Sequence, residues 1–296
     1  MRFTKTKAVI AAAGMSLALA ACGGDDGGEG SDHIELEVAE NPDLSGTPAE
    51  LAESGTIKIG VKIDQPGIGF KEPGSDLPTG FDIEMGRIIA AQLGIDPDSS
   101  NVEWVETISD NRESFIDNGT VDIVIASYSI TDERRAVVGQ AGPYYVTGQQ
   151  LLVRQEDEDR ISGPEDLEGI KVCSVEGSTS LARVQDEYGA DPVPFGTYSE
   201  CVDQLENETV DAVTTDGAIL AGYAAENEEL VVTSEPFSEE RYGIGYKKGD
   251  TEMCEFLNST IEGAFEDGTW QEAFDITLGG AEGVEDPDQP ELDPCE

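Results

Sequence analysis

Beyond residue 50 the sequence alternates strand-like and helix-like runs, and this alternation restricts the fold to the α/β class. Residues 57–61 alternate polar and apolar side chains as a strand does. Residues 81–93 have the apolar spacing of a helix that ends at Gly94, and residues 121–126 are an apolar run typical of a buried strand. These segments predict the beginning of a first α/β lobe.

The same alternation occurs again after residue 148. Its strand-like and helix-like runs lie at residues 150–153, 170–175, 180–188 and 210–215. A strand-like run at 242–246 then leads into two helical segments, 253–267 and 270–278, which we expect to return to the first lobe. Two chain crossings between two lobes imply a hinge.

These crossings define the predicted organisation of the folded part. Lobe 1 is discontinuous and comprises residues 51–148 and 243–280, lobe 2 is the continuous segment 149–242, and residues 281–296 form an acidic C-terminal tail. A chain of this length is sufficient for two lobes of ordinary domain size, each with a substantial core.

The N-terminus has the outline of a secretory signal. Arg2, Lys5 and Lys7 precede an uncharged, alanine-rich run over residues 8–21, which is shorter than the roughly 20 residues that span a bilayer. We therefore expect residues 1–21 to be removed after export. A permanent transmembrane helix is the weaker interpretation.

At the expected cleavage point, residues 19–23 read Leu-Ala-Ala-Cys-Gly, which resembles the lipobox of bacterial lipoproteins. The resemblance implies that the Cys22 thiol carries a diacylglycerol and that a lipid anchor holds the protein on the outer face of the cell membrane. The alternative is an ordinary cleavage site followed by a chance cysteine. Residues 22–50 begin with a Gly/Asp tract and are predicted to form a flexible tether.

The net charge of −46 excludes nucleic acid as a partner, because the phosphate backbone would be repelled. It does not exclude small anions, since screening acts over about 8 Å at physiological ionic strength and a local cationic pocket can dominate its surroundings. We attribute the acidity to a solvated surface, with or without adaptation to salt.

Composition and motifs argue against enzyme chemistry. His33 is the single histidine of the sequence and lies in the predicted tether, which removes histidine triads, general bases and metal sites from the folded region. The sequence contains no GxGxxG, Walker, GxSxG or complete calcium-loop pattern. We predict no enzyme activity, no cofactor and no metal site.

Four cysteines remain after Cys22, and an oxidising compartment allows them to form disulfides. Three pairings are possible. We prefer Cys173 with Cys201 and Cys254 with Cys295, because each pair then joins neighbouring segments and the second secures the polar tail.

Four motifs occur in order along the chain: Gly-Phe-Asp-Ile-Glu at 80–84, the segment 121–135 ending Ser-Ile-Thr-Asp-Glu-Arg-Arg, Gly-Pro-Tyr-Tyr at 142–145, and Val-Asp-Ala-Val-Thr-Thr-Asp at 210–216. Together they resemble the extracytoplasmic solute-binding proteins of polar amino acid ABC transporters, family 3, over nearly all of residues 51–279. The resemblance implies a two-lobed, type II periplasmic-binding-protein-like fold. Within the family, the sequence is most similar to the glutamate/aspartate and glutamine binders.

The resemblance assigns the backbone of an amino acid ligand to matching positions. Arg134 corresponds to the arginine that clamps the α-carboxylate, an anion that fits a guanidinium fork, and the alternative is a surface arginine in a charged turn. Ser127 and Ser129 would line the same wall. Asp216 matches the aspartate for the α-ammonium group, with a polar turn residue as the alternative.

The resemblance also implies that a second polar segment, in lobe 2, lies opposite these residues. Ser178 and Thr179 lie within Gly-Ser-Thr-Ser at 177–180, between a predicted strand and a predicted helix. Their amides could bind the ligand carboxylate at the helix N-terminus, or the segment could simply cap the helix.

The resemblance also places two cations at the distal end of the ligand. Lys62 and Arg112, with Ser109 close by, occupy the positions that face the side-chain carboxylate in glutamate/aspartate binders. Lysine replaces the usual arginine at the first position, and Tyr198 stands where such binders can have a histidine, so glutamine, asparagine or promiscuous recognition stays open. Asp64 would contact the ligand amine or neutralise Lys62.

These inferences predict a monomeric lipoprotein that closes over a polar amino acid, glutamate or aspartate in the first place, and delivers it to a membrane ABC permease. The alternatives are an enzyme on the same fold, of the cyclohexadienyl dehydratase type, and an amino acid sensor or scaffold lipoprotein.

Overall fold

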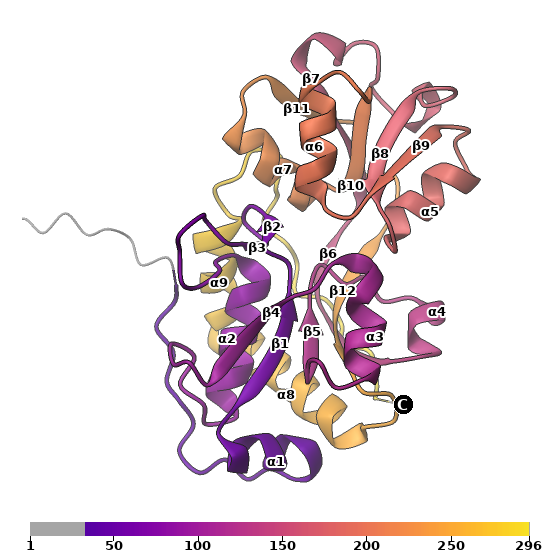
Figure 1. The fold of residues 1–296 in the computed structure, drawn as a ribbon. Helices are drawn as coiled ribbons and strands as arrows, with labels where there is room; N and C mark the ends of the chain where they lie inside the picture. Colours follow the sequence, from indigo (N-terminus) through magenta and orange to yellow (C-terminus); the bar gives the residue numbers. More distant parts are fainter. Residues whose placement is uncertain (1–32, 296) are drawn as a thin grey trace, which may run out of the picture. The chain divides into compact units, whose positions relative to one another are not determined.

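The computed structural model describes residues 33–295, which belong to one compact unit, Asp32–Glu296. The predicted signal peptide, Cys22 and the first part of the predicted tether lie outside the described residues. The unit contains two five-stranded sheets, each covered by helices, which we call lobe 1 and lobe 2 (Figure 1). Within residues 33–295 no helix combines the length and the apolar character needed to cross a bilayer.

The sheet of lobe 1 has the strand order β4-β1-β5-β12-β6. Its strands are β1 (Ile57–Val61), β4 (Val102–Glu106), β5 (Ile123–Ile125), β6 (Gly139–Thr147) and β12 (Glu240–Tyr246). β1 is parallel to β4 and β5, whereas β12 is antiparallel to β5 and β6. A small antiparallel pair, β2 (Asp64–Gln65) and β3 (Gly69–Phe70), follows β1.

Helices cover both faces of this sheet, which explains why β5 is apolar throughout. Ile123 and Ile125 belong to the main core, whereas Val124 packs in a separate cluster with Ile116. Successive side chains of a strand point to opposite faces, so a strand buried on both sides carries no polar alternation. The lobe 1 helices are α1 (Gly46–Ser54), α2 (Phe81–Gln92), α3 (Arg112–Asp117), α4 (Asp132–Arg135), α8 (Thr251–Asp267) and α9 (Thr269–Thr277).

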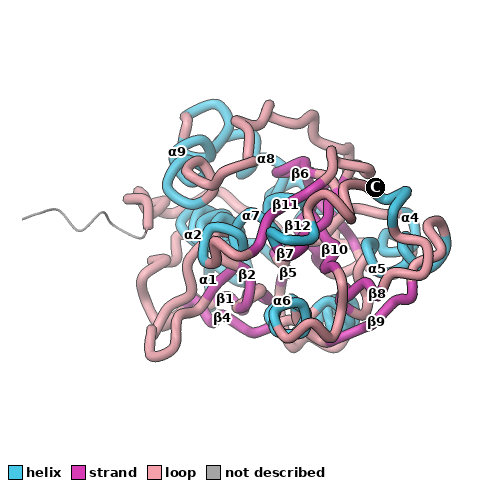
Figure 2. The backbone as a smooth tube through the Cα atoms, turned by 90° about the horizontal axis from the view of Figure 1, so that it is seen from above, coloured by secondary structure: helices cyan, strands magenta, loops and turns pink. Residues whose placement is uncertain are grey.

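Helix α2 is the central helix of lobe 1, since all its residues from Phe81 to Ala91 are buried. It packs against α8 and α9, and the three helices group together in the view from above (Figure 2). The charged Glu84 and Arg87 are buried with the apolar residues and are paired with each other. The predicted helix at 81–93 is therefore confirmed.

The sheet of lobe 2 has the order β11-β7-β10-β8-β9. Its strands are β7 (Gln149–Arg154), β8 (Lys171–Val175), β9 (Asp191–Phe195), β10 (Ala212–Asp216) and β11 (Leu230–Thr233). Its helices are α5 (Thr179–Asp186), α6 (Tyr198–Glu206) and α7 (Gly217–Glu226). Both predicted disulfides are confirmed: Cys173 of β8 is bonded to Cys201 of α6, and Cys254 of α8 is bonded to Cys295.

The structure corrects two predicted boundaries. From His33 on, the segment expected to be a tether packs on lobe 1: Ile34 is 4% exposed, the Ala39 amide donates to the Ala91 carbonyl, and α1 starts at Gly46. The predicted boundary between residues 242 and 243 falls inside β12, whose first residues already pair with β6.

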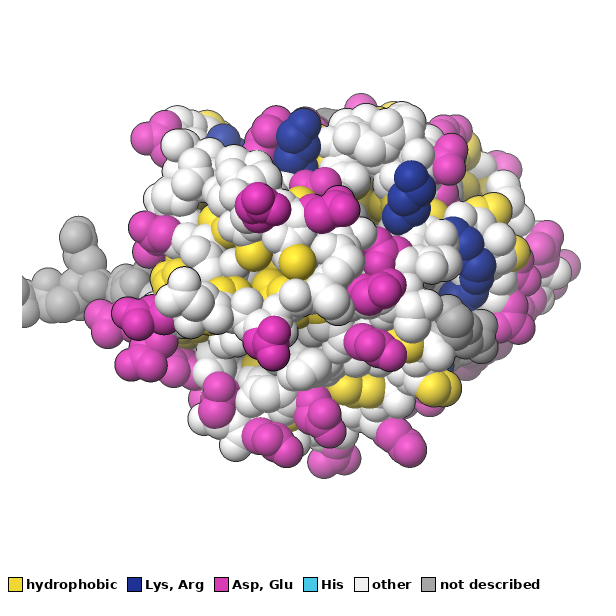
Figure 3. All heavy atoms as spheres, turned by 90° about the horizontal axis from the view of Figure 1, so that it is seen from below, with side chains coloured by type: hydrophobic (Ala, Val, Ile, Leu, Met, Phe, Trp, Pro, Cys, Tyr) yellow, Lys and Arg dark blue, Asp and Glu magenta, His cyan; other side chains and the backbone are white. Residues whose placement is uncertain are grey.

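The acidic surface and the cationic residues of the predicted site are segregated. Figure 3 shows carboxylate side chains spread widely over the face seen from below, with few Lys or Arg side chains. In contrast, Lys62, Arg112 and Arg134 are all less than a tenth exposed. The positive charge of the predicted site is therefore internal and is separated from the solvated acidic surface.

Candidate functional site

Side chains from both lobes converge on one small cavity. The residues that line it are Ser109, Arg112, Ser127, Ser129, Arg134, Ser178, Thr179, Ser180, Tyr198, Thr215, Asp216 and Ile219. They lie at or after the carboxyl ends of β4, β5, β8, β9 and β10, which is where open α/β sheets bind ligands. The cavity volume is about 10 Å³, the room of about one water molecule, so the two walls are closed on each other.

Most of the residues that line the cavity were predicted from the sequence. Every residue predicted to bind the ligand lines the cavity except Lys62 and Asp64. Lys62 contacts the cavity wall through Ser109: the Lys62 Nζ donates a hydrogen bond to the Ser109 hydroxyl at 2.9 Å. Asp64 is directed elsewhere, as described below.

Arg134 is held rigidly at the cavity wall. Its Nη1 donates to the Ser129 carbonyl at 2.7 Å, and its Nη2 donates across the lobes to the Gly177 carbonyl at 2.9 Å. The guanidinium carbon lies 4.8 Å from the centre of the Tyr128 ring, within the range of a cation–π contact. A guanidinium fixed in this way presents its remaining donors without further loss of rotamer entropy.

Arg112 shares the same aromatic platform and the same acceptor. Its guanidinium carbon lies 4.4 Å from the Tyr128 ring centre, and its Nη2 donates to the Gly177 carbonyl at 3.1 Å. Burial and the neighbouring Arg134 lower the pKa of Arg112 to about 10. Two cations that disfavour each other in a buried site would both be stabilised by an added anion.

Lys62 adds a third cationic group. Burial, followed by the charge of Arg112, lowers the pKa of Lys62 to about 7, whereas the Asp64 carboxylate opposes this shift. The ammonium group is therefore balanced between its charged and neutral forms near neutral pH, and a carboxylate brought next to it would favour the charged form.

Asp216 supplies the opposite charge from lobe 2. Its Oδ2 accepts a hydrogen bond from the Tyr242 hydroxyl at 2.6 Å, whereas its buried Oδ1 has no partner among residues 33–295. Burial and the nearby Glu240 raise the pKa of Asp216 to about 7. A buried acceptor without a donor is costly, and an ammonium group of a ligand would satisfy it.

The Gly177–Ser178 turn is shaped by its closeness to lobe 1. Gly177 has φ +75°, and a Cβ there would lie 2.9 Å from Asp110 Cα, so only glycine fits this approach. The Ser178 hydroxyl accepts from the Leu181 amide at 3.0 Å and caps α5, while the Thr179 hydroxyl donates to Glu240 at 2.9 Å. The capping alternative is thus realised at Ser178.

Tyr198 and Asp64 meet at the start of α6. The Tyr198 side chain is buried in the cavity wall, and this burial raises the pKa of its hydroxyl. Its backbone amide donates to Asp64 Oδ2 at 2.8 Å, and the Ser199 amide donates to the same oxygen at 3.4 Å. The Asp64 carboxylate therefore points to a helix terminus of lobe 2, whereas the sequence had led us to expect that it contacts the ligand amine or neutralises Lys62.

Two buried residues that were not predicted as site residues, Gln65 and Asp82, support the wall of the cavity. Gln65 is fully buried, its Oε1 accepts from the Ser127 hydroxyl at 3.0 Å, and its Nε2 has no partner in the described part of the chain. Asp82 accepts from the Tyr144 hydroxyl and from the Ser127 amide at 2.7 Å. Burial raises the pKa of Asp82 to about 6. Its place in the Gly-Phe-Asp-Ile-Glu motif was the available signal.

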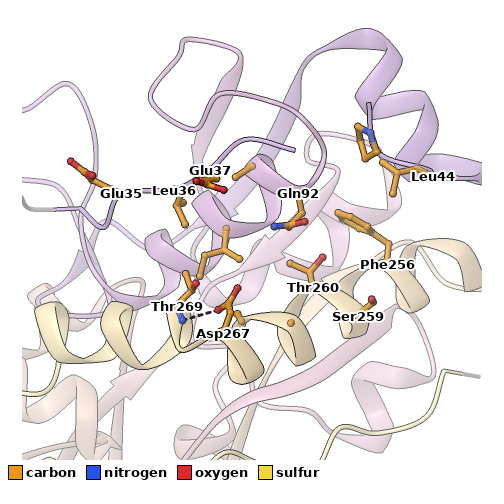
Figure 4. Close-up of a pocket in the computed structure, with 15 residues that line it drawn as sticks. Glu35, Leu36, Glu37, Leu44, Gln92, Phe256, Ser259, Thr260, Asp267 and Thr269 are labelled. Atoms are coloured by element: carbon orange, nitrogen blue, oxygen red, sulfur yellow. Dashed lines mark hydrogen bonds between the residues drawn. The ribbon is translucent and has the colours of Figure 1, made fainter. Parts of the chain in front are cut away.

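A larger groove on lobe 1 has different chemistry. It has a volume of about 640 Å³ and lies between the N-terminal segment, α2 and α8 (Figure 4). Glu35, Glu37 and Asp267 contribute carboxylates to it, while none of its described lining residues is Lys or Arg. Carboxylate ligands would be repelled there, whereas the interlobe cavity is lined by Arg112 and Arg134 and is the better candidate for an amino acid site.

Proteins of known ligand class are similar to this chain in sequence. The glutamate-binding protein GluB of Corynebacterium efficiens is 39% identical over 288 residues, which cover 94% of this chain and 92% of that protein. The ABC transporter glutamine-binding protein GlnH of Bacillus subtilis is 34% identical over 260 residues, covering 86% of this chain and 90% of that protein.

A solved structure extends the likeness to three dimensions and confirms the predicted two-lobed fold. An ancestral arginine-binding protein bound to glutamine superimposes with a TM-score of 0.70 at 34% identity, covering 76% of this chain and 98% of that one. Residues 57–278 match the family model described as bacterial extracellular solute-binding proteins, family 3. The chain accordingly belongs to family 3 of the bacterial extracellular solute-binding proteins.

Proposed function

We propose that this protein binds an acidic amino acid, glutamate or aspartate, between its lobes and delivers it to an ABC permease in the membrane. The observation that carries the proposal is the charge pattern of the cavity. Two buried cations, Arg112 and Arg134, line one wall, and Lys62 donates a hydrogen bond to Ser109 of the same wall. From lobe 2, Asp216 lines the cavity with an oxygen that has no hydrogen-bond partner among residues 33–295. Two carboxylates and one ammonium group are the complement of this pattern.

The backbone of the ligand would bind first to Arg134 and Asp216. The bond from Arg134 to the Gly177 carbonyl at 2.9 Å uses a donor that a ligand α-carboxylate can take over with a stronger, charge-assisted bond. The ammonium group would then reach Asp216 Oδ1. Ser129 and the α5 terminus complete the polar wall.

The side chain of the ligand would extend toward Lys62, Ser109 and Arg112. A distal carboxylate there stabilises the charged form of Lys62 and relieves the repulsion between neighbouring cations. A distal amide can hydrogen-bond to the same groups but brings no charge. The named relatives bind glutamate and glutamine, so both side chains belong in the test.

Calorimetric titration with glutamate, aspartate, glutamine and asparagine tests this proposal directly. We expect the two acids to bind more tightly than their amides, and we expect the bound amino acid to be recovered chemically unchanged after denaturation. If none of the four binds, the acidic-ligand assignment is wrong. Conversion of the ligand would favour the enzyme alternative.

We also propose that the mature protein is a monomer attached to the membrane through a lipid on Cys22. The family is extracellular, and the lipobox-like sequence supplies the attachment point. Cys22→Ala should release the protein from the membrane fraction while its amino acid binding stays intact. Retention of the variant in the membrane would exclude this anchor.

A further inference from the structure

A second contact between the lobes lies beside the cavity, where β2 of lobe 1 and the hairpin loop that follows it meet two helices of lobe 2. On lobe 1 it comprises Asp64 and Pro66, and on lobe 2 it comprises the start of α6 and the middle of α7. We call this contact the Asp64 seam. None of its lobe 1 residues belongs to the described lining of the cavity.

The carboxylate of Asp64 completes the N-terminus of α6. The first amides of any helix lack partners within the helix. Thr197 caps only the Glu200 amide, through its hydroxyl, which leaves the amides of Tyr198 and Ser199 for Asp64. A carboxylate at this end also interacts favourably with the helix dipole, so the bond is charge-assisted.

The neighbouring helix α7 fits the same loop closely. The Tyr223 hydroxyl donates to the Asp64 carbonyl. A Cβ at Gly222 would lie 2.2 Å from the Pro66 carbonyl oxygen, a distance that no real contact tolerates. The helix can therefore reach the loop only because residue 222 has no side chain.

We infer that the Asp64 seam is a latch that holds the two lobes closed, and that Asp64 is a positioning residue for ligand capture. Arg112 and Arg134 each donate a hydrogen bond to the Gly177 carbonyl, and a bound ligand must take over these donors. The Asp64 seam, in contrast, needs no rearrangement when a ligand binds. By fixing the first turn of α6, Asp64 also positions Tyr198 in the cavity wall.

If the Asp64 seam is a latch, ligand affinity depends on residues that do not contact the ligand. This expectation rests on the proposed function. Asp64→Ala should weaken the binding of both glutamate and glutamine by about tenfold or more, as expected for a lost hydrogen bond to a charged group. The loss should be larger for glutamate, because the Asp64 carboxylate also favours the charged form of Lys62. Gly222→Ala should weaken both ligands by the same factor, because its methyl group blocks full closure and leaves the charges near Lys62 unchanged. Both variants should raise the radius of gyration of the ligand-free protein measured by X-ray scattering.

Matched controls separate the latch from general destabilisation. Gly263→Ala makes the same change inside α8, where a Cβ meets nothing within 4 Å. Asp250→Ala removes the carboxylate that caps α8 within lobe 1, where it accepts from the Met253 amide at 3.0 Å. Neither control should alter affinity or the radius of gyration.

The outcomes decide between distinct explanations. An affinity loss in Asp64→Ala without one in Gly222→Ala would mean that Asp64 acts on the ligand itself, which overturns the latch. An unchanged radius of gyration in both variants also overturns it. If wild-type protein binds none of glutamate, aspartate, glutamine and asparagine, the proposed function fails, while the scattering comparison still decides the latch.

Discussion

Arg134 of lobe 1 and Gly177 of lobe 2 are joined by a hydrogen bond of 2.9 Å from the guanidinium to the backbone carbonyl. Arg112 donates to the same carbonyl. The Gly177 carbonyl thus accepts hydrogen bonds from two cationic groups in the closed arrangement. We propose that a ligand α-carboxylate takes its place as their acceptor. A neutral dipole holds this position more weakly than an anion would.

Replacement of Arg134 should therefore weaken the binding of all four amino acids. Truncation of one partner of a buried, hydrogen-bonded charge pair costs about 2–5 kcal/mol, so Arg134→Ala should lose roughly thirtyfold or more in affinity for all four ligands. Arg134→Lys keeps the charge but loses the fork and should recover only part of the loss. A loss confined to the acidic ligands in calorimetry would contradict this role.

Lys62→Met should change selectivity more than affinity. Methionine fills a similar volume without charge, so a distal carboxylate loses its partner while a distal amide loses only a hydrogen bond. We expect the ratio of glutamate to glutamine affinity to fall by about tenfold or more. Arg160→Ala, on the exposed surface of lobe 2, is the control. Equal losses for both ligands would remove Lys62 from the selectivity role.

The same variant should make the ligand-free protein more stable. Burial lowers the pKa of Lys62 from 10.5 to about 7, so folding costs free energy while the amine is protonated, and the cost is relieved as pH rises from about 7 toward 10.5. An apolar replacement of a buried charge often stabilises by about 1–4 kcal/mol. Urea unfolding of both proteins at neutral pH measures the difference, and a less stable variant would refute the expectation.

Glutamine and glutamate should differ in the pH dependence of binding. The raised pKa of Asp216, about 7, favours the protonated carboxyl in the ligand-free fold, a contribution to stability that is lost as pH rises through about 7. An ammonium group needs the ionised form, so glutamine affinity should rise with pH up to about 7, by at most about tenfold per unit. Glutamate should pass through a maximum, because Lys62 loses its proton above about 7.

Titrations of both ligands in steps of pH test these profiles. Asp216→Asn should remove the rise for glutamine, and Lys62→Met should remove the fall for glutamate. Parallel profiles for the two ligands in the wild-type protein would show that Lys62 does not face the distal group.

The disulfide in lobe 2 should stabilise the α6 wall of the cavity. Cys173 and Cys201 join β8 to α6 across 28 residues of sequence. Their joint replacement by alanine should cost about 2–4 kcal/mol of unfolding free energy, mainly by relaxing the constraint on the unfolded chain. Guanidinium unfolding against wild type measures this cost, and a value near zero would show that the core alone holds α6.

Sequence patterns predicted the regular parts of this molecule and missed the contacts made at long range. The strands β1, β5, β8, β10 and β12 follow apolar runs, so their existence could be read from periodicity. The edge strand β9 contains two prolines, and the edge strand β4 carries two glutamates among its five residues, so neither was predicted.

The site was predicted residue by residue through motif resemblance, but the direction of each side chain was not. Asp64 follows Lys62 by two residues, yet its carboxylate binds a helix terminus 134 residues later in the chain. The N-terminal segment was similarly misjudged, because its acidic composition concealed the anchoring of Ile34 and His33 beside the buried Glu84. Such partners lie far apart in the sequence and become visible only in the folded chain.

Lobe 2 enters and leaves the fold as one uninterrupted insertion between β6 and β12, and neither disulfide links it to lobe 1. All three cations near the cavity come from lobe 1, whereas Asp216 and the α5 terminus come from the insertion. Recombination that exchanges one contiguous stretch of the gene, with its ends at the two crossings between the lobes, would replace one wall of the cavity. The other wall would stay unchanged. The architecture therefore allows the two walls to be recombined as modules.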